Sequence, residues 1–311
     1  MLTKRICLVL GAGASLPYGF PTGGELLDYI KGQQPDEWWP LARELFSSER
    51  VQDDHERLVS TARRLGSESI DHLVGKQTRF REYAKALVAY RISQGETPPR
   101  VLQAGRDWHN FLIRHATDEK PLNEVTPISV VTFNFDRSFE EATLGRLAAA
   151  YELVDDTEAE ARARVAKVLR TWPIVHVHGS LGALPELASN EAVVRPYRQI
   201  KEPGDLALGS QGVTLLDDAV EDSPDFTRAR ELICAAEVVL FLGFAFHRLN
   251  CKRVIPRAWG ADNNILYATS KGMSVGAVNK AKERFYPSRS LQTFDEDSLK
   301  MLEVVENAFS N

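Results

Sequence analysis

Three turns in this sequence carry residues whose types and spacing could do chemistry, and the first of them is rich in glycine. It consists of Gly11, Ala12, Gly13, Ala14 and Ser15. Glycines let a backbone approach a pyrophosphate closely, and a helix beginning near Ala14 would favour its negative charge. The alternative is a plain strand-to-helix turn, because Leu16 stands where a G-x-G-x-x-G motif has its third glycine.

The second turn, residues 132–136 (TFNFD), closes an apolar run. In open α/β sheets, ligands bind outside the carboxyl ends of the strands, so Asn134 is placed to contact one. Thr132 and Asp136 complete this part of the candidate pocket. Asp136 could also cap the helix expected from residue 137, and we expect it mainly to orient the loop.

The third turn follows another apolar run and contains two histidines. Alternation along a strand puts His176 and His178 on the same face. Gly179 should end the strand, which leaves His178 at the rim and His176 deeper in the sheet. A histidine opposite a glycine-rich turn is a candidate for acid–base work. A metal-binding pair is the alternative, but neither a carboxylate nor a cysteine accompanies the histidines at ligand spacing.

Two more turns could complete a pocket. Gly243 and Phe244 end a very apolar run, and Gly243 would again permit close backbone approach. Ser270 follows a further apolar run, where its hydroxyl could meet a ribose or a phosphate.

These turns need a sheet to position them, and the sequence predicts one. Strands are expected at residues 5–10, 128–133, 174–177, 238–242, 265–268 and 291–294. Helical patterns separate these runs, which predicts an α/β fold with a doubly wound, mostly parallel sheet. A helical subdomain is expected to be inserted at about 24–122, and a loop-rich excursion at about 183–225.

Composition narrows the class of protein. The 311 residues are 43% hydrophobic and 26% charged with a net charge of −5, which does not suggest a nucleic-acid binder. Cys7, Cys234 and Cys251 form no C-x-x-C pair, which excludes a four-cysteine zinc site within the chain and fits a reducing cytoplasm. The apolar run 6–10 is shorter than the hydrophobic segment of a signal peptide, which has roughly 7–15 residues. No run reaches the roughly 18 residues of a membrane span.

Taken in order, these motifs resemble the sirtuin superfamily. Residues 11–15 resemble its G-A-G-x-S loop, residues 132–136 its T-x-N-x-D motif, and His178-Gly179 its catalytic H-G pair. Gly243 stands where a G-T-S segment would begin, although Phe244 and Ala245 replace Thr and Ser. The resemblance spans roughly residues 4–295 and implies a single sirtuin-type, Rossmann-like domain over residues 1–311 that binds NAD.

Departures from the family pattern bear on the reaction. Protein-deacylating sirtuins carry a four-cysteine zinc ribbon after the H-G pair, whereas residues 183–225 contain no cysteine. Thr22 stands where those enzymes have the aspartate of a P-D-F-R segment. Residues 17–26 and 69–73 instead resemble the zinc-free sirtuin-like domains of bacterial antiphage systems.

That resemblance implies NAD hydrolysis, with NAD as the substrate and no zinc. Asn134 and His178 are the implied catalytic residues. Asn134 would orient the attacking water or a ribose hydroxyl, and His178 would act as general base. The implied NAD contacts are Gly11, Ala12, Gly13, Ser15, Thr22, Thr132, Asp136, Gly243, Phe244 and Ser270.

Other functions stay open at this point. A protein deacylase or ADP-ribosyltransferase could use the same fold, although the missing zinc ligands argue against it. A non-catalytic sensor of NAD or ADP-ribose is a further alternative. A nuclease subunit finds no support in the charges or the carboxylates.

The resemblance also implies partners, since an uncontrolled NAD hydrolase would kill its host. We expect a homo-oligomer activated by a separate sensor or ATPase subunit, for example of the HerA type. Apolar surfaces of the helical insertion are the expected contacts. Neither a membrane nor direct nucleic-acid binding is expected.

Overall fold

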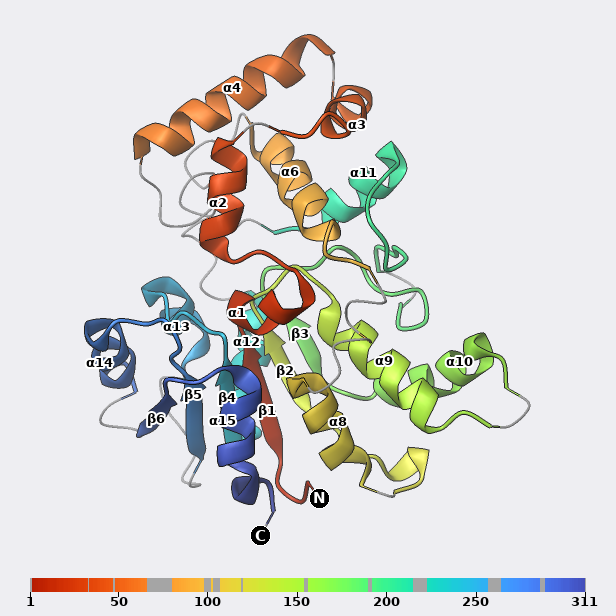
Figure 1. The fold of residues 1–311 in the computed structure, drawn as a ribbon, viewed down its shortest axis with the longest axis vertical. Coiled ribbons are helices and arrows are strands. Elements are labelled where there is room, and N and C mark those ends of the chain that lie inside the picture. Colours follow the sequence, from red (N-terminus) through yellow and green to blue (C-terminus); the bar gives the residue numbers. More distant parts are fainter. Residues whose placement is uncertain are drawn as a thin grey trace.

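The computed structural model describes residues 2–32, 34–46, 48–65, 80–97, 102, 107–118, 120–153, 156–189, 192–214, 223–256, 264–285 and 289–310. Its centre is one sheet (Figure 1). The strands are β1 Ile6–Leu10, β2 Ser129–Thr132, β3 Ile174–His176, β4 Val238–Leu242, β5 Ile265–Thr269 and β6 Leu291–Phe294. Their order is β3-β2-β1-β4-β5-β6, and every neighbouring pair is parallel.

The predicted α/β fold with a doubly wound parallel sheet is therefore confirmed. Chain order reverses between β1 and β4, which are hydrogen-bonded neighbours. This reversal is the topological switch point, where open α/β sheets bind ligands beyond the carboxyl ends of their strands. The switch point thus lies between the glycine-rich turn after β1 and the turn after β4.

Helices cover both faces of the sheet because its central strands are apolar on both sides. Every residue of β1 and of β4 is buried. Leu8 packs into the core on one face, whereas Val9 packs into the core on the other. The first core includes α8 Trp108–Thr117, α9 Ser138–Ala150, α10 Glu158–Leu169 and α15 Ser298–Val304. The second includes α12 Pro224–Ala235, α13 Arg248–Val254 and α14 Val275–Glu283.

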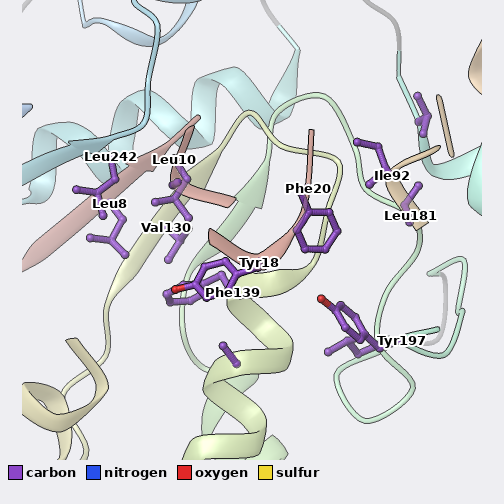
Figure 2. Close-up of a cluster of buried hydrophobic side chains, with 14 of the residues drawn as sticks. Leu8, Leu10, Tyr18, Phe20, Ile92, Val130, Phe139, Leu181, Tyr197 and Leu242 are labelled. Carbon is purple, nitrogen blue, oxygen red and sulfur yellow. The ribbon is translucent and has the colours of Figure 1, made fainter. Parts of the chain in front are cut away.

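A group of helices extends the first core beyond the carboxyl ends of the strands (Figure 1). It comprises α2 Gly23–Lys31, α3 Trp38–Leu45, α4 Ser48–Leu65, α6 Arg81–Ser93 and α11 Pro203–Gly212. Figure 2 shows the core continuing from Leu8 and Leu10 of β1, past Tyr18 and Phe20, towards Ile92 of α6. Burial of this apolar surface joins the helical group to the sheet.

The segment expected to be loop-rich contains a regular helix, so that prediction is wrong for residues 203–212. α11 carries Pro203 and three glycines, which are poor helix formers, and it has no clear apolar stripe. It packs against α3 and α6. A Cβ on Gly209 would lie 3.2 Å from Ile200 and 3.6 Å from Ala89 of α6. Close packing by a small residue stabilises this helix, and periodicity does not reveal it.

Two other observations concern the remaining segments. Among the helices of the described ranges, none is both long and apolar enough to cross a membrane. Residues 69–73, which carry part of the resemblance to antiphage domains, lie outside the described residues.

A buried ionic network links the helical group to the sheet. Glu96, just after α6, accepts two hydrogen bonds from Arg137, at 2.8 and 2.7 Å, and a third from Arg195. The three side chains are at most 1% exposed. Arg137 also donates to the carbonyls of Gly182, at 3.1 Å, and of Arg195. Burial lowers the pKa of both arginines to about 10, so they stay cationic at neutral pH.

We predict that Glu96→Gln lowers the free energy of unfolding by about 3–5 kcal/mol, because it leaves two buried guanidinium groups without their carboxylate. Urea denaturation would measure this. The matched control is Glu231→Gln, which breaks an exposed pair with Arg228 and should cost less than about 1 kcal/mol. Equal effects of the two substitutions would show that the buried network does not carry this stability.

Candidate functional site

The glycine-rich turn after β1 is pressed against the turn after β4. The Gly13 amide donates to the Gly243 carbonyl at 3.1 Å, and the Gly11 amide donates to Leu242 at 3.0 Å. Gly243 has φ +58°, and a Cβ there would lie 2.0 Å from the nitrogen of Ala14. The glycines therefore allow two backbones to touch at the switch point. Their contact with a pyrophosphate stays a prediction.

The helix that follows this turn is shorter than expected. α1 Ala12–Ser15 begins two residues before Ala14 and continues as a 3-10 turn, η1 Leu16–Tyr18. One turn of helix has few aligned peptide dipoles, so any attraction for a phosphate is weak. The indole of Trp108 in α8 donates to the Ala14 carbonyl at 2.9 Å and fixes the turn from one side.

Asn134 joins the turns after β1 and β2. Its amide nitrogen Nδ2 donates to the Gly11 carbonyl at 3.1 Å and to the Ser15 hydroxyl at 3.0 Å. Its backbone amide donates to the hydroxyl of Thr132 at 3.1 Å. Both amide hydrogens of the side chain are thus donated within the protein, and its oxygen Oδ1 is the end left for a ligand. Ser15 and Asn134, which are 119 residues apart in the sequence, meet here with 3% and 8% of their surface exposed.

Asp136 completes this cluster and lies two residues before Ser138, where α9 begins. Its carboxylate accepts from the amide of Ser138 at 3.0 Å, which satisfies a free donor at the beginning of the helix. Burial raises its pKa, although hydrogen bonds from Ser138 and Ser15 act in the opposite direction. These contacts fit the orienting role expected for Asp136.

His176, the last residue of β3, and His178, two residues beyond it, point to opposite faces of the sheet, so the prediction of a shared face is wrong. β3 ends at His176, and a turn closed by the Gly179 amide on the His176 carbonyl rotates the next residues. Alternation holds only along a strand, so it fails beyond His176. His176 faces α9, whereas the His178 ring packs against Phe226 of α12.

His178 is 4% exposed and lies among aromatic rings. Its ring is 5.5 Å from that of Phe133 and 6.3 Å from that of Phe135, measured between centroids. These two phenylalanines flank Asn134 in sequence. His178 is therefore a neighbour of the Asn134 turn, although it is buried rather than at the rim.

His176 has a partner that the sequence reasoning missed. Glu140, in the first turn of α9, lies 2.6 Å from Nε2 of His176, and Nδ1 lies 3.0 Å from the carbonyl of Asn134. Burial lowers the pKa of His176, but the Glu140 carboxylate outweighs it, and the pKa is raised. Glu140 lies four residues after Asp136, on the helix face turned to the sheet, and this position was the signal in the sequence that could have identified it. Both side chains line a cavity of about 430 Å³ beside β3.

The remaining predicted contacts are Phe244, Ser270 and Thr22. Phe244 is buried with its ring 4.9 Å from that of Phe133. Ser270 is buried at the end of β5, and its amide donates to Phe294 at 2.7 Å. Thr22 begins α2, where its hydroxyl and Glu25 form a capping box. Capping explains Thr22 without a ligand. Across the described part of the chain, no group of three or more His, Cys, Asp or Glu could hold a metal ion.

Comparisons with known proteins give only distant likenesses, all of them to solved structures. No family model matches the chain, and neither does any curated protein. Among solved structures, a mutant Sir2 homologue in complex with 2′-O-acetyl ADP ribose is similar over 99% of this chain and 94% of that one. Identity is 14% and the TM-score is 0.44. So distant a likeness assigns no activity, and the site residues must carry any functional proposal.

We predict that Gly243→Ala destabilises the fold by at least about 2 kcal/mol, because the methyl group would overlap the turn after β1 at a positive φ. Gly276→Ala is the matched control, since a Cβ there meets nothing within 4 Å and Gly276 lies in α14. It should leave stability unchanged or raise it by up to about 1 kcal/mol. Thermal unfolding monitored by circular dichroism compares the two, and a stable Gly243→Ala would contradict the close contact.

A second prediction concerns pH. The pKa of His176 is raised in the folded state, so its pair with Glu140 stabilises the fold fully below about pH 6.5 and loses this effect as pH rises through the raised value. Glu140 has a lowered pKa, so its contribution is lost only below about pH 4.5. The melting temperature of Glu140→Gln should therefore lie furthest below that of the wild type between about pH 4.5 and 6.5. A gap that widens at pH 9 would contradict the assignment.

Proposed function

We propose that the chain hydrolyses NAD at the bond between nicotinamide and ribose. The observation that carries this proposal is the Asn134 cluster, in which residues from the turns after β1 and β2 meet beside the switch point. These are the residues whose motifs resemble the NAD site of sirtuins. Their position beyond the carboxyl ends of parallel strands suits a dinucleotide.

Cleavage of the bond between nicotinamide and ribose requires the protein mainly to orient the reacting groups. Breaking this bond gives an oxocarbenium-like centre, as glycoside cleavage does, and nicotinamide leaves as a neutral molecule. A group that fixes the attacking water or a ribose hydroxyl then contributes most. Asn134 can do this through Oδ1, because its amide hydrogens already hold the side chain to Gly11 and Ser15.

His178 is the proposed general base. Its ring lies beside Phe133 and Phe135, on either side of Asn134. An imidazole accepts a proton near neutral pH, which suits removal of the proton from water or from a ribose hydroxyl. Because the ring is buried, we propose that NAD binding moves the phenylalanines apart before the reaction.

A non-catalytic binder of NAD or ADP-ribose is the second candidate. One observation favours it: Ser15, Asn134 and His178 are each less than 9% exposed. A non-catalytic binder would change conformation when the ligand binds but would not cleave the ligand. Calorimetric binding of NAD, without loss of NAD over hours, would support this candidate over hydrolysis.

The biological setting is also part of the proposal. The zinc-free motif pattern supports an NAD-depleting effector of bacterial antiphage defence, working in the cytoplasm. We propose that assembly into a homo-oligomer, or with a separate sensor or ATPase subunit, controls its activity. The absence of cysteine from residues 183–225 supports hydrolysis without zinc, rather than protein deacylation.

We predict that Asn134→Ala and His178→Ala each reduce nicotinamide release from NAD by at least about 100-fold, through lost orientation and lost proton transfer. Chromatography of the products would measure release, with the chain tested alone and with its partner. Asn279→Ala is the matched control, because Asn279 is exposed and lies on α14. Full turnover by both site variants, with unchanged circular dichroism, would overturn the catalytic assignment.

A further inference from the structure

His176 links the third strand to the proposed catalytic turn through two hydrogen bonds. Nδ1 lies 3.0 Å from the backbone carbonyl of Asn134, and Nε2 lies 2.6 Å from the carboxylate of Glu140. The side chains of His176 and Glu140 are 14% and 13% exposed. The histidine thus lies between α9 and the very residue proposed to orient the attacking group.

Both partners of the ring are acceptors. A backbone carbonyl can only accept a hydrogen bond, and so can an ionised carboxylate. Glu140 is ionised, because its pKa is lowered by His176 and Arg137 in spite of burial. Both ring nitrogens must therefore carry hydrogen at once, and only the imidazolium cation does so.

The charges around the ring agree with this state. Glu140 faces it from α9, and Asp136 acts on it from the turn after β2. Two cationic groups also belong to these surroundings: Arg137, at the start of α9, acts on Glu140, and Arg170 lines the same cavity and donates to the Glu186 carbonyl. The cavity of about 430 Å³ opens the pair to protons from solvent.

We propose that His176 is a positioning residue, which as an imidazolium clamps the backbone of Asn134 and so fixes its side-chain oxygen for the reaction. One continuous chain of hydrogen bonds then runs from Glu140 through His176 and Asn134 to Gly11. It crosses from β3 over β2 to β1. Loss of the ring proton breaks one of its links.

This clamp gives the reaction a pH dependence of known sign. In the wild type the carboxylate keeps His176 charged above pH 6.5, and catalysis should fall only as pH rises through the raised pKa. Without the carboxylate, burial still lowers the pKa of His176, and only the Asn134 carbonyl and Asp136 remain to raise it, so the pKa falls below that of the wild type. The alkaline fall in turnover should then come at lower pH.

The kinetic test rests on the proposed NAD hydrolysis and uses Glu140→Gln in the full chain. We expect the alkaline limb of kcat to move down by at least about one pH unit, with KM for NAD changed less than about twofold. The ratio of Glu140→Gln turnover to wild-type turnover should rise towards one as pH is lowered from the alkaline side. The matched control is Glu306→Gln, which removes the carboxylate of a similar arrangement: His115 there bonds the Phe111 carbonyl at 2.7 Å and Glu306 at 2.8 Å. Its pH profile should stay that of the wild type.

A spectroscopic test needs no activity. In protein labelled with ¹⁵N-histidine, the His176 signals are identified by their loss in His176→Gln. At pH 6.5 both ring nitrogens should show mainly imidazolium shifts in the wild type, and the change to neutral-ring shifts should come at lower pH in Glu140→Gln than in the wild type. A neutral His176 in the wild type overturns the proposal. So does a Glu140→Gln profile that falls equally at every pH. Absence of nicotinamide release by the wild type would refute NAD hydrolysis, while the spectrum would still decide the state of His176.

Discussion

The buried bonds between Glu96, Arg137 and Arg195 are the constraint on which the rest of this structure depends. One carboxylate accepts hydrogen bonds from two guanidinium groups, and all three side chains are shielded from water. Charges in such a place are stable only while each has its partners. The network therefore ties the end of α6 to the start of α9 and to the segment around residue 195. It also fixes Arg137, the immediate neighbour of Asp136 in the candidate site.

Within that frame, the candidate site is organised by hydrogen bonds between turns. Asn134 lies at the centre, because it contacts the turn after β1 with its side chain and His176 with its backbone carbonyl. Parallel strands bring these turns together, since all their carboxyl ends lie at one edge of the sheet. Glycines at positions 11, 13 and 243 then let the turns after β1 and β4 touch. Close backbone contact is a structural reason for these glycines that operates without any ligand.

Two buried histidines show how strongly surroundings decide chemistry in this protein. His109 stacks on Tyr18 at 4.5 Å between ring centroids, and burial lowers its pKa well below the usual value. His176 is also buried, yet the carboxylate of Glu140 raises its pKa. The pKa of the same residue type therefore moves in opposite directions in the two places. Neither its charge nor its role follows from the residue type alone.

The sequence by itself determined the sheet and most of its elements. Apolar runs predicted the central strands β1 and β4, because a strand buried on both faces has little room for polar side chains. The other four strands of the described sheet also lie where the sequence predicted them. Helical patterns between those runs likewise predicted that helices separate the strands, as α9, α10 and α14 do. Only the tertiary structure decided α11, whose glycines are stabilised by packing against α6 rather than by helix propensity. The tertiary structure also decided that the side chains of His176 and His178 point to opposite faces at the end of β3, and that Glu140 contacts His176. Contacts between residues distant in sequence depend on the residue at which a strand ends and on the position at which a helix packs. The pattern of residue types does not determine these two positions to the single residue.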